Sequence, residues 1–236
     1  MKEKRFTGIK HMSYVFLINL VLAGIIAGLY LALIYPYSTE AVAVSGFPIY
    51  KGSNRQSVAL EFTVSWEARA LPQIMDLLLE NDMNATFAVS GEWAENNGEL
   101  LRRMQSEGHE IAIMGYSPNE DGRASFIEKD LKKAMDAVYA ETGFTPKLYY
   151  CGNRNANVSS IAAKRLNLTP IKCTVDLLCA NGSGSDIMNR VQGNTNGGDI
   201  LLVAPTQSFL QALPDILAYF EDRGLTITTV SGTIYN

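Results

Sequence analysis

Acidic side chains near the ends of expected strands are the residues of this sequence best placed to do chemistry. Four carboxylates fall there: Glu61, Glu67, Asp176 and Asp199. A hydrolase that works with paired carboxylates needs two acids roughly 5 to 10 Å apart across a sugar bond. Glu61 stands two residues before Thr63, so both side chains point to the same face of a strand. Because no second acid is evident beside it, we interpret Glu61 as a buried acid that hydrogen-bonds Thr63 or a backbone amide.

Histidine offers little for a nucleophilic or metal site. The sequence has 2 His, and only His109 lies beyond the first few residues. Its place at a helix–strand junction is typical of a hydrogen-bonded packing residue. A serine nucleophile, Ser65 or Ser117, would need this histidine as its base, and no G-x-S-x-G motif is present.

Alternating strands and helices must position these groups. Seven or eight short strands alternate with helices, beginning with VALEF at 58–62 and ending with LTITTVS at 225–231. This rhythm predicts a parallel α/β fold of the barrel kind, in which functional groups sit where the strands end. Among the expected elements are one helix over 92–108 and one strand over 168–176. No repeat is visible, which disfavours a solenoid.

Composition and charge exclude some classes of protein. The chain has 236 residues, 47% of them hydrophobic and 19% charged, which is the composition of a globular domain. The net charge is -4, with both signs mixed along the chain. A nucleic-acid partner is therefore not expected.

The N-terminal region predicts a membrane anchor. Residues 14–35 contain no charged side chain, and a helix of that length reaches roughly 33 Å, enough for the ~30 Å hydrocarbon layer. Residues 1–13 are rich in Lys and Arg, which places them in the cytoplasm by the positive-inside rule. We expect a single-pass cell-membrane protein with a linker and a lead-in strand at 36–56 and an extracytoplasmic domain at 57–236.

A cleaved signal peptide is the alternative for the same segment. The small residues Ala41-Val42-Ala43 resemble a cleavage site. The apolar stretch is longer than the ~7–15 residues of a signal-peptide core, which favours the uncleaved anchor. Under either reading the domain is exported.

Three cysteines lie in the exported part, Cys151, Cys173 and Cys179. An odd number permits at most one disulfide and leaves a free thiol. A bridge between Cys173 and Cys179 would close a small loop. A zinc site with a fourth ligand is the other possibility, but the C-x5-C spacing matches no common zinc pattern. We predict buried or bridged structural cysteines, and neither a metal nor a cofactor.

The exported part, roughly residues 50 to 232, resembles the polysaccharide deacetylases of the NodB-homology type, most closely their sporulation-associated branch. VALEFTVSWE at 58–67 is similar to the family's VALTFDISWG. The stretch PQIMDLLLENDMNATFAVSGEWAENNGELLRRMQSEGHEI at 72–111 is in register with the family without a gap. TGFTPKLYY, GGDILLV and ALPDILAYFEDRGLTITTVS are similar to later family segments. The resemblance implies a deformed (β/α) barrel of about seven parallel strands.

The resemblance also implies where catalytic groups should lie. Family members remove acetyl groups from N-acetylated sugars with an aspartate base, a metal held by an aspartate and two histidines, an orienting arginine and a histidine acid. At the matching positions, in that order, this chain carries Thr63, Val64, Met114, Pro118, Tyr150 and Ala204. None of these side chains is a carboxylate, an imidazole or a guanidinium. The resemblance therefore implies that the catalytic and metal groups have been lost.

These observations predict a membrane-anchored pseudoenzyme that binds cell-wall glycan or an envelope protein, with sporulation suggested by the resemblance alone. The residues expected in a ligand-binding cleft are Glu61, Trp66, Tyr116 and Tyr150. The alternative is an active N-deacetylase of peptidoglycan or chitooligosaccharides, or another hydrolase, with a non-standard site built on Glu61 or a cysteine. A purely structural partner protein is a third possibility.

Overall fold

The computed structural model describes residues 16, 19–26, 47–66, 68–118 and 122–235. The chain divides into two compact units, Met1–Ser45 and Gly46–Asn236. In the first unit, Phe16 and residues 19–26 are helical. The cytoplasmic segment expected at 1–13 lies outside the described residues, as does most of the anchor expected at 14–35. No helix in the described part of the chain is long and apolar enough to cross a membrane.

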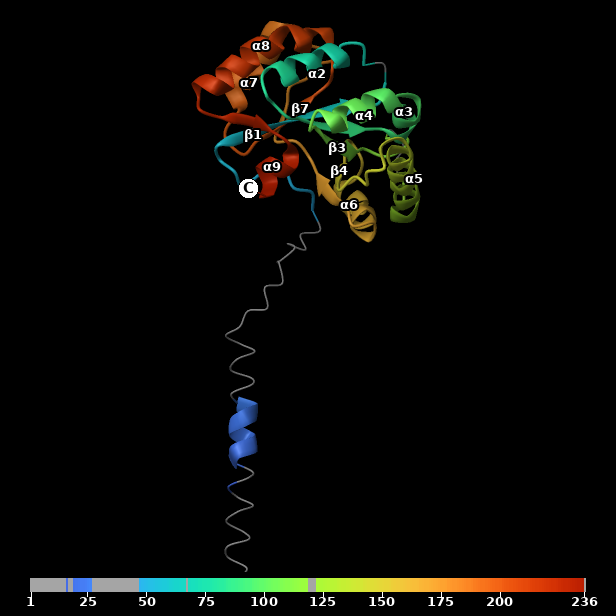
Figure 1. Cartoon of the computed structure of the whole chain (residues 1–236), viewed down its shortest axis with the longest axis vertical. Helices are drawn as coiled ribbons and strands as arrows, with labels where there is room; N and C mark the ends of the chain where they lie inside the picture. The colour runs from blue at the N-terminus through green and yellow to red at the C-terminus, as the bar shows by residue number, and fades with distance from the viewer. Residues whose placement is uncertain (1–15, 17–18, 27–46, 67, 119–121, 236) are drawn as a thin grey trace, which may run out of the picture. The chain divides into compact units, whose positions relative to one another are not determined.

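The second unit, called the α/β unit below, is built on one sheet of parallel strands (Figure 1). The strands are β1 (Ser57–Val64), β2 (Thr86–Val89), β3 (Glu110–Ile113), β4 (Leu148–Tyr150), β5 (Thr169–Ile171), β6 (Val175–Asp176), β7 (Ile200–Val203) and β8 (Thr226–Thr228). Their order is β5-β4-β3-β2-β1-β7-β6, and β8 pairs with β1. The parallel α/β class is as predicted, but the sheet forms a half-barrel where a deformed barrel was expected, with eight strands in the described residues against about seven expected.

Helices cover the outer face of the sheet. They are α2 (Leu71–Glu80), α3 (Gly91–Asn96), α4 (Gly98–Ser106), α5 (Ala124–Thr142), α6 (Ala156–Arg165), α7 (Gly184–Asn194) and α8 (Gln207–Asp222). A further helix, α9 (Val230–Tyr235), packs at the amino-terminal ends of β1 and β2. The strand β1 alternates as its sequence predicts, with Leu60 and Phe62 in the helix-facing core and Ala59 in the smaller inner core. The Phe62 ring stacks on Phe87 with centroids 5.0 Å apart. The outer core thus fixes β1, whose inward residues face the site.

The single helix expected over 92–108 is wrong, because the chain forms α3 and α4 with a break at Asn97. The backbone of Asn97 has φ -134 and ψ 38, outside the helical region. Its side-chain amide donates a hydrogen bond to the Trp93 carbonyl at 2.8 Å, which caps the end of α3. Asn97 followed by Gly98 therefore ends one helix before the next begins.

The single strand expected over 168–176 is also wrong. This segment forms β5 and β6, which lie at opposite ends of the strand order. The Lys172 N–H donates to the Ile49 carbonyl at 2.9 Å, whereas the Thr174 N–H donates to the Ile200 carbonyl at 2.8 Å. The chain therefore changes hydrogen-bonding partners between these residues and crosses from one edge of the sheet to the other. This crossing carries residues 172–176 over the mouth of the half-barrel.

The helix α9, six residues long at the C-terminal end of the described chain, is not predicted by the sequence pattern. The Val230 N–H donates to Thr86 Oγ1 at 2.8 Å. The hydroxyl of Ser57 lies 3.3 Å from that of Thr233. These contacts place α9 against the amino-terminal ends of β1 and β2, so it closes the half-barrel opposite the mouth.

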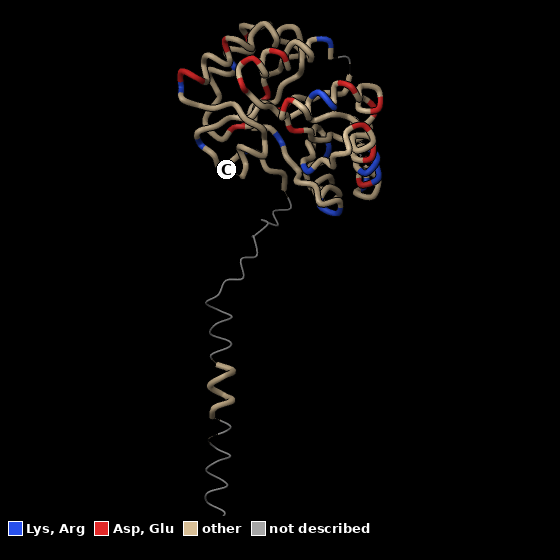
Figure 2. The backbone as a smooth tube through the Cα atoms, viewed as in Figure 1, with Lys and Arg blue, Asp and Glu red and all other residues tan. Residues whose placement is uncertain are grey.

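Charged residues of both signs are interspersed over the α/β unit (Figure 2). Several exposed cations have acidic partners nearby, as in the pair of Lys132 and Asp136 at 3.0 Å on α5. Arg102 on α4 likewise pairs with Glu141 on α5 at 2.8 Å. Such exposed pairs contribute little to stability, on the order of 0.2–1 kcal/mol each.

Candidate ligand-binding cleft

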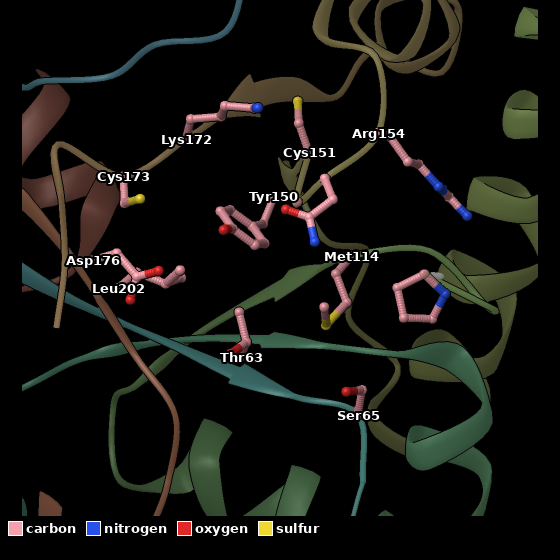
Figure 3. Close-up of a pocket in the computed structure, with 13 residues that line it drawn as sticks. Thr63, Ser65, Met114, Tyr150, Cys151, Arg154, Lys172, Cys173, Asp176 and Leu202 are labelled. Carbon is pink, nitrogen blue, oxygen red and sulfur yellow. The ribbon is translucent and has the colours of Figure 1, made fainter. Parts of the chain in front are cut away.

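A hollow of about 490 Å³ opens at the carboxyl ends of the strands. Its inner face is formed by Thr63 of β1, Met114 after β3, Tyr150 of β4 and Leu202 of β7. One wall is the loop 151–154 after β4, and the other is the crossing segment 172–176 (Figure 3). The carboxyl ends of parallel strands are the usual place for a ligand site in such folds. We call this space the main hollow.

The structure brings together several positions that the family resemblance singles out. Thr63, Met114, Pro118 and Tyr150 all line the main hollow. Val64 and Ala204 line a second space of about 180 Å³, called the side hollow. Thr63 and Ser65 line both spaces, so the end of β1 separates them. Positions that are far apart in the sequence therefore meet around the end of one strand.

The residues present at this mouth do not fit the metal that the family implies. The Thr63 hydroxyl donates to the Val203 carbonyl at 3.4 Å, and Met114 and Pro118 offer a thioether and a ring without a donor oxygen. The usual ligands of zinc are thiolate, imidazole and carboxylate groups. Among the described residues, no group of three or more His, Cys, Asp or Glu is placed to hold a metal ion.

Glu61 lies below the inner face of the main hollow and is not among the residues that line it. Its side chain is 0% exposed, and neither carboxylate oxygen has a hydrogen-bond partner among the described residues. The predicted bond from Glu61 to Thr63 or a backbone amide is therefore wrong. Burial, with a smaller contribution from the charge of Glu110, raises the pKa of Glu61 to about 8. The group is mostly an uncharged acid at neutral pH.

The surroundings of Glu61 explain why it has no partner. In the sheet register Glu61 is opposite Thr86, and Thr86 is opposite Glu110. The Thr86 hydroxyl is already used, because it donates to Glu110 at 2.7 Å and accepts from Val230. Glu110 is a second acid that was not expected here, although its spacing from Ala112 on β3 places it on the inner face.

Two loops at the mouth are held by one buried ion pair. Arg154 donates to Asp130 at 2.7 Å, and the two side chains are 2% and 8% exposed. Arg154 also donates to the Ser117 carbonyl at 2.9 Å. Asp130, from α5, accepts the backbone N–H groups of Tyr116 at 3.1 Å and Ser117 at 2.9 Å. The loop after β3 and the loop after β4 are thus fixed to the same helix.

The aromatic residues expected in the cleft are separated by the structure. Tyr150 lines the main hollow, and burial raises the pKa of its phenol so that it stays protonated. Trp66 is 72% exposed and lines the side hollow. Tyr116 lines neither space: its hydroxyl donates to Glu95 at 2.8 Å and its ring lies 3.3 Å from Lys133 Nζ. Two of the three rings therefore remain available to a ligand in these spaces.

All three cysteines are free thiols, so the suggested Cys173–Cys179 bridge is not formed. Cys151 and Cys179 are buried, as expected for structural cysteines, while Cys173 is partly exposed. Burial raises the pKa of each thiol to about 11. A thiol is a nucleophile only as the thiolate, so these groups are poor nucleophiles at neutral pH.

His109 is a packing residue, as predicted. Its Nδ1 accepts the Ala85 N–H at 3.3 Å, and its ring packs edge-on against Phe87 with centroids 5.1 Å apart. Burial lowers the pKa of the imidazole, which favours the neutral form. The residue lies immediately before β3, at the opposite end of the strand from Met114 and the main hollow.

The sequence is similar to proteins of two Bacillus species. The uncharacterized protein YlxY of Bacillus subtilis is 26% identical over 190 residues, which are 78% of this chain and 59% of YlxY. A peptidoglycan-N-acetylglucosamine deacetylase of Bacillus cereus is 27% identical over 187 residues, which are 75% of this chain and 68% of that protein. The chain thus spans about three fifths of the length of YlxY.

The fold is that of known structures. Wild-type BA3943 from Bacillus anthracis, described as a CE4 family pseudoenzyme, superposes with a TM-score of 0.76 at 24% identity, covering 80% of this chain and 69% of BA3943. A mutant of BA3943 described as having restored enzymatic activity gives the same TM-score. The family profile described as polysaccharide deacetylase matches residues 50–171, more than half of the chain. This chain therefore belongs to the polysaccharide deacetylase family.

Proposed function

We propose that this chain binds cell-wall glycan without deacetylating it. The observation that carries the proposal is a main hollow of about 490 Å³ whose inner face bears Thr63, Met114 and Tyr150 in place of ionisable catalytic groups. Sites for small molecules range over roughly 300–1,000 Å³, so the space suits a sugar residue. The main hollow thus has room for a ligand but lacks the catalytic groups that deacetylation needs.

The chemistry of deacetylation supports this proposal. Amide hydrolysis at a metal site needs a metal to activate water, a base to accept its proton and an acid to protonate the leaving amine. The Thr63 hydroxyl is not a base near neutral pH, Met114 is not a ligand for a hard cation, and the methyl group of Ala204 has no acidic proton to donate. A sugar acetamide bound here would meet no activated water.

The relatives support a glycan of the bacterial wall as the ligand. One relative is named as a peptidoglycan-N-acetylglucosamine deacetylase and another as a peptidoglycan-N-acetylmuramic acid deacetylase. BA3943, with the same fold, is described as a pseudoenzyme, which gives a precedent for loss of activity on this scaffold. Because those names describe other proteins, peptidoglycan is the ligand to test first.

The proposed place of action is outside the cell membrane. This placement is proposed because the apolar stretch at 14–35 is preceded by basic residues, which favour the cytoplasm and leave the α/β unit on the outer side. Fractionation of cells that express the full chain, followed by protease treatment of intact spheroplasts, tests this placement. Loss of the α/β unit while residues 1–13 stay protected is expected, and protection of the whole chain would contradict it.

Binding and turnover are separated by one experiment. The full chain is incubated with acetylated chitooligosaccharides and peptidoglycan fragments, with zinc or cobalt added, while acetate release and retention on insoluble peptidoglycan are measured. Retention without acetate above the blank is expected. Acetate release would overturn the pseudoenzyme proposal. Failure of retention, with co-purification of an envelope protein, would replace the glycan by a protein partner.

A hydrolase with a non-standard site is the second candidate, and Glu61 is the observation that favours it. A carboxyl group with a pKa of about 8 has the proton affinity of a general acid or base near neutral pH. Its burial at 0% exposure below the main hollow argues against contact with a substrate. If turnover is found, loss of that turnover in Glu61→Gln would support this candidate, and unchanged turnover would exclude it.

A further inference from the structure

Two opposite charges face the main hollow without pairing with each other. Lys172 and Asp176 both line it, from the two ends of the crossing segment. In the view of Figure 3, the Tyr150 ring lies between them. No ion pair within 4.0 Å involves either side chain among the described residues. An ammonium and a carboxylate thus line one space without forming an ion pair with each other.

The charges of Lys172 and Asp176 affect the pKa values of thiols that line the main hollow. Burial raises the pKa of the Cys173 thiol to about 11, and the negative charge of Asp176 adds to that rise. The positive charge of Lys172 acts in the opposite direction, because it favours a lower pKa for the thiols of Cys151 and Cys173. Asp176 is also fixed locally, because its Oδ1 accepts the Leu178 N–H at 2.8 Å. The two charges therefore belong to the hollow and not to distant surface.

The other ionisable groups nearby contribute little net charge. Arg154 lines the hollow, but its charge is balanced by Asp130 at 2.7 Å. Burial keeps Glu61 uncharged at neutral pH, and Tyr150 and Cys173 remain protonated. What remains is one positive charge at Lys172 and one negative charge at Asp176. A ligand with a single charge would satisfy only one of them.

We propose that the main hollow takes a zwitterionic ligand, with its carboxylate at Lys172 and its ammonium at Asp176. The inference rests on the proposed function when the ligand is a wall sugar with a free amine and an acidic substituent. A free amino acid carries the same two groups and is the other source. An acetylated sugar lacks the cation, since an acetamide is uncharged, and would leave Asp176 without a partner.

Four related sugars test the contributions of the two ligand charges one at a time. Muramic acid carries an amine and a carboxylate, N-acetylmuramic acid the carboxylate alone, glucosamine the amine alone, and N-acetylglucosamine neither. The full chain is titrated with each by calorimetry at about pH 6.5, where amines of this kind are protonated. Muramic acid is expected to bind tightest, by about fivefold for each charge, the factor that corresponds to about 1 kcal/mol per ion pair.

Charge-removing variants assign each contact. Lys172→Met should abolish the preference for sugars with the carboxylate, and Asp176→Asn the preference for sugars with the amine. Matched controls remove the same charges from exposed residues outside the hollow, Lys147→Met and Asp222→Asn. These controls should keep the affinity order of the unaltered chain. A control that changes the order as much as its partner variant would overturn the assignment.

The outcomes distinguish this inference from the proposed function. Equal affinity for all four sugars, or tightest binding of either acetylated sugar, would overturn the zwitterion while leaving glycan binding intact. A third outcome is that alanine binds, that both variants lose this binding, and that no sugar binds. This outcome would support a zwitterionic ligand and overturn the proposal that the ligand is a glycan. No binding of the four sugars or of alanine would overturn both.

Discussion

The guanidinium of Arg154 donates to the carboxylate of Asp130 at 2.7 Å, and this buried pair ties the loop after β4 to α5. Asp130 also holds the loop after β3 through two backbone N–H groups. Both loops line the main hollow, since Pro118 belongs to one and Arg154 to the other. The shape of the ligand site therefore depends on a residue that no ligand in the hollow would touch.

Removal of this carboxylate is expected to destabilise the α/β unit. Asp130→Ala leaves a buried guanidinium uncompensated, which typically costs about 3–5 kcal/mol of unfolding free energy. Urea denaturation measures the loss, and retention on peptidoglycan should fall with it. The control is Asp136→Ala, whose exposed pair with Lys132 contributes about 0.5 kcal/mol or less. Equal losses in the two variants would contradict the role assigned to Asp130.

Glu61 makes stability depend on pH. Its pKa is raised from 4.5 to about 8, so between these values the folded chain keeps a proton that the unfolded chain has lost. The unfolding free energy should therefore fall as pH rises from about 4.5 to about 8, by about 1.4 kcal/mol per unit of pKa difference at most. The other ionisable groups around it are Glu110, Tyr150, Cys151 and Cys173.

The substitution Glu61→Gln should remove this dependence. The variant is expected to match the unaltered chain near pH 5 and to exceed it in unfolding free energy near pH 8, because the amide cannot ionise. Urea titrations at several pH values measure both curves. Glu80→Gln, an exposed control on α2, should leave the pH dependence in place. Parallel curves for Glu61→Gln and the unaltered chain would show that Glu61 does not titrate inside the fold.

The thiols should react slowly with alkylating agents. With a pKa of about 11, Cys173 is almost entirely protonated near pH 8, although it lines the main hollow. Iodoacetamide labelling followed by mass spectrometry should modify Cys173 first, because Cys151 and Cys179 are buried. Muramic acid should slow the reaction. Labelling of Cys179 ahead of Cys173, or a rate equal to that of a free thiol, would contradict this order.

Ala204→His alone should not give deacetylase activity. A general acid has no effect when neither a base nor a metal is present to form the intermediate that it protonates. Acetate release from chitooligosaccharides in the presence of zinc is the measurement, with the unaltered chain as the control. Turnover by this single variant would mean that water is activated at the mouth by a group assigned no such role.

The α/β class and the position of the hollow were predictable because both follow from local pattern. The alternation in β1 separates outward residues such as Phe62 from inward ones such as Thr63, and functional groups of parallel sheets gather where strands end. The family resemblance identified which of these positions correspond to catalytic residues in the family.

The missed features depend on contacts between distant segments. Residues 168–176 look like one strand, and only the switch from Ile49 to Ile200 as partner shows where it breaks. The same crossing brings both Lys172 and Asp176 to the main hollow, which their spacing in the sequence does not show. Glu61 likewise lacks a partner because of contacts between distant strands: the hydroxyl of Thr86 on β2 already donates to Glu110 on β3.

The most direct test of glycan binding without deacetylation is to measure acetate release and retention together, on the full chain with acetylated peptidoglycan and added zinc. Retention of the chain with acetate no higher than in the protein-free blank is the predicted result. Release of acetate that grows with time and with protein concentration would contradict the account.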